Sequence, residues 1–204
     1  MYKRQKYHLR AQCVGVIPNF VNTDLFKPGT APKEANSVVS VGRLTPVKRF
    51  DLLIRACAKI PGVKLTIFGE GPERHKLKEL AVEMGIDLDM PGNIPNQFLP
   101  EKLASNKVFA LVSKWEGHPK ALIEAMSCGL PCVCSIEGHG TLTEGVFVAP
   151  PEEMALANAI QRFLQDADLL SEYAGRARRF ADKRYSFPEL FGMEKQILEK
   201  ISHA

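Results

Sequence analysis

The chain has 204 residues, of which 45% are apolar and 25% charged, a composition typical of a globular protein and unlike that of disordered, collagen-like or coiled-coil chains. This length favours one α/β domain. The net charge of +4 lies in the first ten residues, which hold Lys3, Arg4, Lys6 and Arg10 and no acid, so residues 11 to 204 sum to zero. A neutral body offers no continuous basic face to a phosphate backbone, and we therefore expect no nucleic-acid partner.

Residues 1 to 12 form a basic head that we expect to be disordered or non-native, and residues 13 to 204 form the domain itself. The head is too polar for a secretory signal, which needs an apolar stretch of about 7 to 15 residues. No apolar run reaches the roughly 18 residues that a membrane helix requires. We therefore expect a cytoplasmic protein.

Short β-rich runs alternate along the chain with segments of helical period. Strands are predicted at residues 14–17, 37–41, 63–68, 88–90, 108–112, 131–135 and 146–148. Helices are predicted at residues 50–60 and 73–84, and then consecutively at 151–165, 168–182 and 188–201. Because parallel strands need crossover connections, this order predicts a Rossmann-like, doubly wound, mainly parallel sheet followed by a helical C-terminal segment.

Two further segments carry structural expectations. Residues 28–36, a polar loop with two prolines and a glycine, are the best candidate for disorder within the domain. Cys128, Cys132 and Cys134 have apolar neighbours and are interpreted as reduced core thiols. The alternative is a metal site completed by His118 or His139, but its ligands would fall on a helix end and on alternate positions of one strand.

Ligands of open parallel sheets bind at the carboxyl ends of the strands, so the loops that follow the strands are where chemistry is expected. The first such loop contains Gly42, which permits close backbone approach, and two cations, Arg43 and Lys48. Arg suits bidentate phosphate contacts and Lys acts as a point charge, so the pair could converge on one anion. The alternative is a pair of solvated cations at a helix start, where positive charge is slightly unfavourable.

The second loop contains Gly69 and Gly71 in the sequence F-G-E-G-P. Two glycines allow a backbone to pass close to a ligand, but they serve a tight turn equally well. No third glycine completes a dinucleotide-binding fingerprint, so this signal is weak alone.

The third loop leads into a short helix that is punctuated at both ends. Pro119 fits the first helical position, Gly129 fits the end of the helix, and Pro131 prevents its continuation. The free N–H groups and the dipole at the start of this helix suit a phosphate. Glu116 precedes that start and Glu124 lies within the helix, so two carboxylates flank the expected phosphate position. Glu124 could instead pair with a neighbouring Lys or Arg.

The spacing of Glu116 and Glu124, E-x7-E within E-G-H-P-K-A-L-I-E-A-M-S-C-G-L-P, closely resembles the signature of retaining glycosyltransferase family 4, whose members have the GT-B fold. Four other blocks follow in the family's order. They are V-I-P-N-F-V-N at 16–22, G-R-L at 42–44 followed by Lys48, F-G-E-G-P at 68–72, and P-G-N-I-P at 91–95. The likeness covers about residues 13 to 200 and corresponds to the carboxyl-terminal, donor-binding half of a GT-B enzyme.

The resemblance implies a role for each candidate residue. Arg43 and Lys48 would neutralise the diphosphate of a UDP- or GDP-sugar and stabilise the leaving group, and Glu116 would contact the transferred sugar. Glu124 would accept hydrogen bonds from the ribose. Main-chain contacts to the base would come from Asn93 and Ile94, and the remaining phosphate cradle would comprise Gly42, Gly69, Gly71, Gly117, His118, Pro119, Lys120 and Ala121.

The resemblance also implies that no metal cofactor is needed and that the leaving phosphate assists deprotonation of the acceptor. His118 as a base is the less favoured alternative, since a loop histidine is more often a hydrogen-bonding neighbour. The acceptor would be a glycan, a lipid or a small molecule, and the resemblance leaves open a peripheral membrane association of the parent enzyme.

Two departures from the family pattern bear on activity. The acceptor-binding N-terminal domain is missing from the 204 residues, and the loop at 136–145, which normally helps to hold the donor sugar, is short. The alternatives to a transferase are therefore a non-catalytic nucleotide-sugar-binding module and, less favoured because of the E-x7-E block, a protein like a nucleotide-sugar epimerase.

Overall fold

The computed structural model describes residues 17–135 and 145–202. The predicted basic head and the short loop at 136–144 lie outside these ranges, as does most of the strand expected at 14–17. Its last residue, Ile17, is described and is not in a strand.

The sheet is parallel throughout. Within the described ranges it has six strands in the order β3-β2-β1-β4-β5-β6, and every neighbouring pair is parallel. The strands are β1 (Ser37–Val41), β2 (Lys64–Phe68), β3 (Asp87–Gly92), β4 (Val108–Leu111), β5 (Cys132–Cys134) and β6 (Val146–Val148). The prediction of a doubly wound parallel sheet is therefore confirmed.

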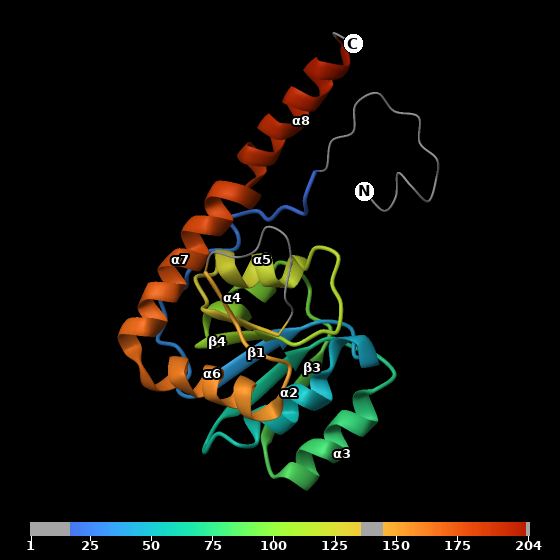
Figure 1. Ribbon diagram of the computed structural model, residues 1–204, viewed down its shortest axis with the longest axis vertical. Coiled ribbons are helices and arrows are strands. Elements are labelled where there is room, and N and C mark those ends of the chain that lie inside the picture. Colours follow the sequence, from blue (N-terminus) through green and yellow to red (C-terminus); the bar gives the residue numbers. More distant parts are fainter. Residues whose placement is uncertain (1–16, 136–144, 203–204) are drawn as a thin grey trace.

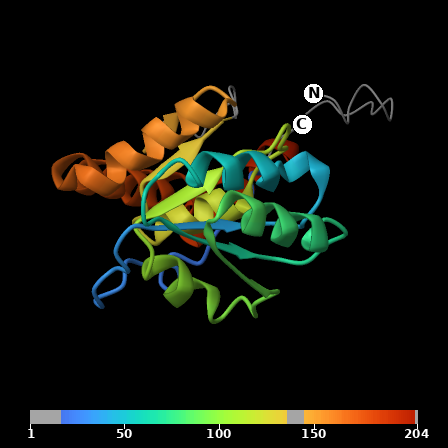
Figure 2. The same cartoon turned by 90° about the horizontal axis from the view of Figure 1, so that it is seen from below.

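Helices cover both faces of this sheet. One face packs against α2 (Phe50–Cys57), α3 (Arg74–Met84) and α6 (Glu153–Gln165), and the other against α4 (Leu99–Ala104), α5 (Lys120–Ser127) and much of α7 (Ala167–Tyr185). Figure 2 shows α2 and α4 on opposite sides of the strands. Strand side chains alternate between the two cores, so Val38 faces the first and Val39 the second.

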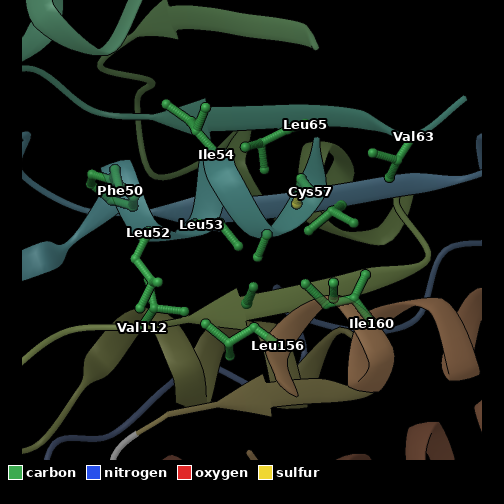
Figure 3. Close-up of a cluster of buried hydrophobic side chains, with 14 of the residues drawn as sticks. Phe50, Leu52, Leu53, Ile54, Cys57, Val63, Leu65, Val112, Leu156 and Ile160 are labelled. Atoms are coloured by element: carbon green, nitrogen blue, oxygen red, sulfur yellow. The ribbon is translucent and has the colours of Figure 1, made fainter. Parts of the chain in front are cut away.

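The first core shows why residues 50–57 are helical. Phe50, Leu53, Ile54 and Cys57 recur at helical spacing and are all almost fully buried. Figure 3 shows them packed over the sheet, with Leu156 and Ile160 of α6 and Leu65 of β2 closing the same cluster. Burial of several large side chains, at about 1.5 to 3 kcal/mol each, fixes α2 and the loop before it on the sheet.

The reversal of strand order between β1 and β4 creates the topological switch point. On one side of β1 lie β2 and then β3, and on its other side lie β4, β5 and β6 in chain order. Ligands of open α/β sheets bind outside the carboxyl ends of the strands at such a point. Here the loops after β1 and β4 meet, because the Lys114 N–H donates to the Val47 carbonyl at 2.7 Å.

Some element boundaries differ from those expected. A 3-10 turn, η1 (Pro46–Lys48), precedes α2, and helix α4 was not predicted because its six residues are too few for a periodic signal. Pro119 is the N-cap of α5 rather than its first helical residue, since its carbonyl accepts hydrogen bonds from the N–H groups of Leu122 and Ile123 while its own backbone is extended.

The expectation of disorder at residues 28–36 was wrong. The Lys33 ammonium donates to the carbonyls of Ala104 and Asn106, and the Glu34 N–H donates to the carbonyl of Ser105. These bonds tie the polar loop to the end of α4, a long-range contact that the loop's own composition could not predict.

Cys128, Cys132 and Cys134 are buried in the second core, as the core-thiol interpretation predicts. Burial raises the pKa of Cys128 to about 12, which keeps the thiol protonated. In residues 17–135 and 145–202, no three His, Cys, Asp or Glu side chains are grouped as a metal site would require.

The C-terminal helix α8 (Phe187–Ser202) extends beyond the body of the domain (Figure 1). Its Phe187 and Phe191 are exposed, and the Phe187 ring meets the edge of Phe20 with centroids 5.7 Å apart. None of the helices in the described part of the chain combines the length and hydrophobicity of a membrane span.

Candidate functional site

The loop after β1 places Lys48 at the switch point. Gly42 leaves room for the Lys48 stem, because a Cβ on Gly42 would lie 3.3 Å from Lys48 Cε. The Lys48 ammonium lies 2.5 Å from Oε1 of Glu116, which follows β4. This ion pair therefore joins the two loops that leave the switch point, which a hydrogen bond from the Lys114 N–H to the Val47 carbonyl also connects.

Glu116 is held by a second donor. The Ser113 hydroxyl, at the end of β4, donates to the same Oε1 atom at 2.6 Å. The Glu116 side chain is only 13% exposed, so its charge is balanced by Lys48 rather than by bulk water. Both donors engage one oxygen, which leaves Oε2 as the acceptor atom for a ligand.

Arg43 stands apart from this group. Its side chain is exposed, and its guanidinium makes no hydrogen bond or ion pair with any residue that the structure describes. Five donor N–H groups in a planar fork are therefore presented to solvent beside the β1 end.

Gly69 and Gly71 hold two loops together. A Cβ on Gly69 would lie 2.0 Å from the Gly42 carbonyl oxygen, and one on Gly71 would lie 2.4 Å from the carbonyl oxygen of Leu44. The Gly42 N–H donates to the Phe68 carbonyl, which joins the same two loops. The close approach that these glycines permit is thus to the neighbouring loop, and it differs from both the ligand approach and the tight turn considered from the sequence.

Asn93 and Ile94 follow β3 and lie farther along the same edge of the sheet. Asn93 is exposed, Ile94 is half-buried against the second core, and both line a cavity of about 360 Å³. The Gly69 N–H donates to the Gly92 carbonyl and so links this loop to the one after β2.

The start of α5 presents unpaired backbone donors. No acceptor in the described ranges pairs with the N–H groups of Lys120 and Ala121, and no side chain caps this helix. Free N–H groups at a helix start carry a partial positive charge and favour an anion. Before them, Gly117 is exposed, and the His118 Nδ1 accepts from the Asn19 N–H at 3.3 Å.

His118 is engaged by structural contacts on both sides. The Asn19 side-chain amide donates to the His118 carbonyl at 2.6 Å, and the imidazole packs edge-on against Tyr185 with ring centroids 5.3 Å apart. These contacts favour the interpretation of His118 as a hydrogen-bonding neighbour over that of a base.

Glu124 is the buried carboxylate of the site. Its side chain is 6% exposed, and the Lys120 ammonium, one turn earlier, lies 3.9 Å from Oε1. Burial raises the pKa of Glu124 to about 7, and the nearby Lys120 charge opposes that rise. The pairing with a neighbouring lysine that the sequence left open is therefore present, but at a distance too long for a hydrogen bond.

These positions can be compared with known proteins. The model of the family described as glycosyl transferases group 1 matches residues 21–180 of this chain. The chain belongs to this family. The match extends from Val21 into helix α7 and so includes every candidate site residue.

Curated relatives of this group 1 chain are named as glycosyltransferases. An uncharacterized glycosyltransferase of Haemophilus influenzae is 33% identical over 188 residues, which cover 87% of this chain and 51% of the relative. The lipopolysaccharide core biosynthesis glycosyltransferase LpsE of Rhizobium meliloti is 30% identical over 197 residues, covering 91% of this chain and 57% of the relative. This chain therefore spans little more than half the length of these two relatives.

Solved structures share the fold, which is that of one half of a GT-B glycosyltransferase. Sucrose-phosphate synthase from Thermosynechococcus elongatus superposes with a TM-score of 0.85 at 25% identity, over 99% of this chain and 56% of the other. The Anabaena protein HepE, solved in complex with UDP and glucose, superposes with a TM-score of 0.79 at 24% identity, over 98% of this chain and 60% of the other.

Sequence reasoning missed two residues at this edge of the sheet. Ser113 was overlooked because serine is common in loops, although a polar residue directly after the apolar run 108–112 was a signal. Arg49 was overlooked beside Lys48. Its left-handed backbone, with φ 53°, is unusual for a residue other than glycine and has no signature in the sequence.

Proposed function

We propose that this chain is the donor-binding half of a retaining glycosyltransferase of family 4, which transfers a sugar from a UDP- or GDP-sugar to a glycan, lipid or small acceptor. The observation that carries the proposal is the Lys48–Glu116 ion pair across the switch point, beside the uncapped start of α5. A cation, free amide donors and a carboxylate follow β1 and β4 at this edge of the sheet, and they are the groups that a sugar diphosphate requires.

The diphosphate is assigned to Arg43, Lys48 and the N–H groups of Lys120 and Ala121. The cations and the helix dipole would stabilise the negative charge that develops on the leaving diphosphate. Lys48 already lies against Glu116, so a bound phosphate would share its ammonium with that carboxylate. Glu116 Oε2 would then accept a hydrogen bond from a hydroxyl of the transferred sugar.

The nucleoside is assigned to Glu124, Asn93 and Ile94. An ionised Glu124 would accept hydrogen bonds from the two ribose hydroxyls, and the main chain at 93–94 would hold the edge of the base. Because the pKa of Glu124 is raised to about 7, its ionisation at neutral pH depends on the hydrogen bonds that a ligand supplies.

In the transfer, the bond between the anomeric carbon and the phosphate oxygen breaks as the acceptor oxygen bonds to the same face of that carbon. The acceptor proton passes to the departing phosphate oxygen, which keeps charge and atoms balanced. An acceptor must be positioned for this step, and this is the proposed role of an N-terminal domain that the relatives' greater length would accommodate. Without it, the chain would act as a cytoplasmic nucleotide-sugar-binding module.

The proposal is tested by isothermal titration calorimetry of the chain with UDP, GDP and ADP. Saturable binding of UDP or GDP is expected, with an affinity reduced at least tenfold by Arg43→Ala. Lys78→Gln, which removes an exposed charge on α3, is the matched control and should bind normally. Absence of binding to all three nucleotides would refute the proposal.

A further inference from the structure

A second cavity opens at the same edge of the sheet, beyond β4. It has a volume of about 530 Å³ and is lined by Arg49, Ser113, Lys114, Ser135 and the segment 148–151. These residues follow β1, β4, β5 and β6, so the cavity lies on the opposite side of the switch point from Asn93 and Ile94. Its size is that of a small-molecule site.

Two buried hydroxyls form part of its wall. Ser113 is 2% exposed and donates to Glu116, and Ser135 is 8% exposed. The Ser135 hydroxyl oxygen is fully shielded and has no hydrogen-bond partner among the residues that the structure describes. A buried hydroxyl without a partner is destabilising, so this one is suited to a ligand oxygen.

The charged groups in the wall are all positive. Arg49 and Lys114 contribute a guanidinium and an ammonium, and no described carboxylate lines the cavity. Glu116, which accepts a hydrogen bond from Ser113, is paired with Lys48, and Glu153 in the first turn of α6 is paired with Lys59. One guanidinium nitrogen of Arg49 donates to the Pro151 carbonyl at 3.2 Å, which fixes the side chain and leaves its other N–H groups for a ligand.

The backbone adds to this positive potential. Arg49 is the N-cap of α2, and the segment 148–151 leads directly into α6, so two helices begin at this cavity. Arg49 also keeps a left-handed conformation, which is strained for a residue with a side chain, at a position where glycine would be unstrained. A cation at a helix start opposes the helix dipole, so Arg49 is at an unfavourable position that a bound anion would relieve.

We infer that this cavity binds an anionic group, a carboxylate or a phosphate monoester, carried by one of the sugar substrates. The inference rests on the proposed function, because Ser113 is shared with Glu116 and so places the cavity on the sugar side of the diphosphate site. The anion would accept hydrogen bonds from Arg49 and Ser135 and would be attracted by Lys114. Its source would be an acidic donor sugar or a phosphorylated acceptor.

Two pairs of probes separate the sources. UDP-glucuronate is compared with UDP-glucose for the donor, and glucose 6-phosphate with glucose, with and without UDP, for a free anion. Binding is measured by calorimetry and by the fluorescence of Trp115, which is the chain's one tryptophan, is 72% exposed and immediately precedes Glu116. The acidic member of at least one pair should bind roughly tenfold more tightly than its neutral counterpart.

The variants Arg49→Gly and Lys114→Gln should each reduce this preference while leaving the affinity for UDP unchanged. Glycine fits the left-handed backbone at position 49, so Arg49→Gly is expected to fold. Lys78→Gln removes one exposed charge from α3 and should leave the preference intact.

Equal binding of the acidic and neutral members of both pairs, with UDP still bound, would overturn this inference and leave the proposed function standing. A preference that survives the double variant Arg49→Gly/Lys114→Gln would overturn it as well. If no nucleotide binds, the proposed function fails, and the glucose 6-phosphate pair then decides the anion site by itself.

Discussion

The two carboxylates that flank the start of α5 have the same side chain and opposite surroundings. Glu116 lies in the loop before the helix and is neutralised by Lys48 at 2.5 Å and by the Ser113 hydroxyl. Glu124 lies inside the helix, almost fully buried, and its nearest cation is 3.9 Å away. The charge of Glu116 is therefore set by the protein, whereas that of Glu124 is left to be set by a ligand.

This difference gives the two carboxylates different roles, because Glu116 is positioned by the protein and Glu124 is suited to recognise a ligand. A carboxylate that is ion-paired and hydrogen-bonded within the protein is held in one geometry before a ligand arrives. A buried carboxylate with a raised pKa is destabilising when ionised unless hydrogen-bond donors reach it. The hydroxyls of a ribose are such donors, and their arrival would couple binding of the nucleotide to ionisation of Glu124.

The largest expected effect comes from moving the loop that carries Lys48 away from Glu116. In Gly69→Ala the new Cβ would lie 2.0 Å from the Gly42 carbonyl oxygen, so the two loops must separate. We expect a loss of unfolding free energy above about 3 kcal/mol, measured by urea denaturation.

The matched control for this substitution is Gly85→Ala. Gly85 also has a positive φ, of 65°, but has no atom within 4 Å of the Cβ position, so only the backbone cost of about 1 kcal/mol is expected. Equal losses for the two variants would contradict the loop-packing role of Gly69.

The second effect is a pH dependence that belongs to Glu124. Its pKa rises from 4.5 to about 7 in the folded state, so the folded protein binds the extra proton between these values. The unfolding free energy should therefore fall as the pH rises from about 4.5 to about 7, by up to about 3 kcal/mol, and then level off.

Glu124→Gln should lack this fall and should be the more stable protein at pH 8. It should also bind UDP at least tenfold more weakly there, since an amide is a poorer acceptor for two hydroxyls. Denaturation and calorimetry at pH 5, 6, 7 and 8 measure both quantities. Identical pH profiles for the two proteins would exclude Glu124 as the titrating group.

A smaller effect is expected when Glu116 loses its cation. Lys48→Met leaves the 13% exposed carboxylate with Ser113 as its one described donor, and we expect a loss of about 1 to 2 kcal/mol in unfolding free energy. The affinity for UDP should fall about tenfold as a phosphate contact is lost. Lys78→Gln, which removes an exposed charge, serves again as the charge control. An unchanged UDP affinity in Lys48→Met would show that Lys48 does not contact the phosphate.

The smallest effect is that of the hydroxyl that orients Glu116. Ser113→Ala removes one hydrogen bond to Oε1 and should cost about 1 kcal/mol of unfolding free energy and a few-fold in affinity for a UDP-sugar. Ser40→Ala removes a buried serine hydrogen bond between β1 and β4 and should lower stability without changing affinity. A UDP-sugar affinity as high in Ser113→Ala as in Ser40→Ala would show that orientation of Glu116 does not matter.

The sequence predicted the sheet and the α5 loop because both rest on local signals. Apolar runs such as 108–112 and the punctuation of α5 by Pro119 and Gly129 are readable without partners. The pairing of Lys48 with Glu116, by contrast, joins residues 68 positions apart and follows from the strand order.

What sequence reasoning missed has a common physical cause. Lys33 binds the carbonyls of Ala104 and Asn106 and so orders its loop, and Ser113 donates to the Glu116 carboxylate three residues later. Both are contacts between polar groups, which a prediction from composition places in solvent. The unshielded guanidinium of Arg43 was expected as a ligand group, and its assignment to phosphate stays a prediction.

The central claim is that one nucleotide diphosphate bridges the cations after β1 and the start of α5. The most direct measurement is a crystal structure of the chain with UDP. We predict that the diphosphate contacts Arg43, Lys48 and the N–H of Lys120, and that both ribose hydroxyls reach Glu124. UDP bound elsewhere, or bound here without contacting any of these groups, would contradict the account.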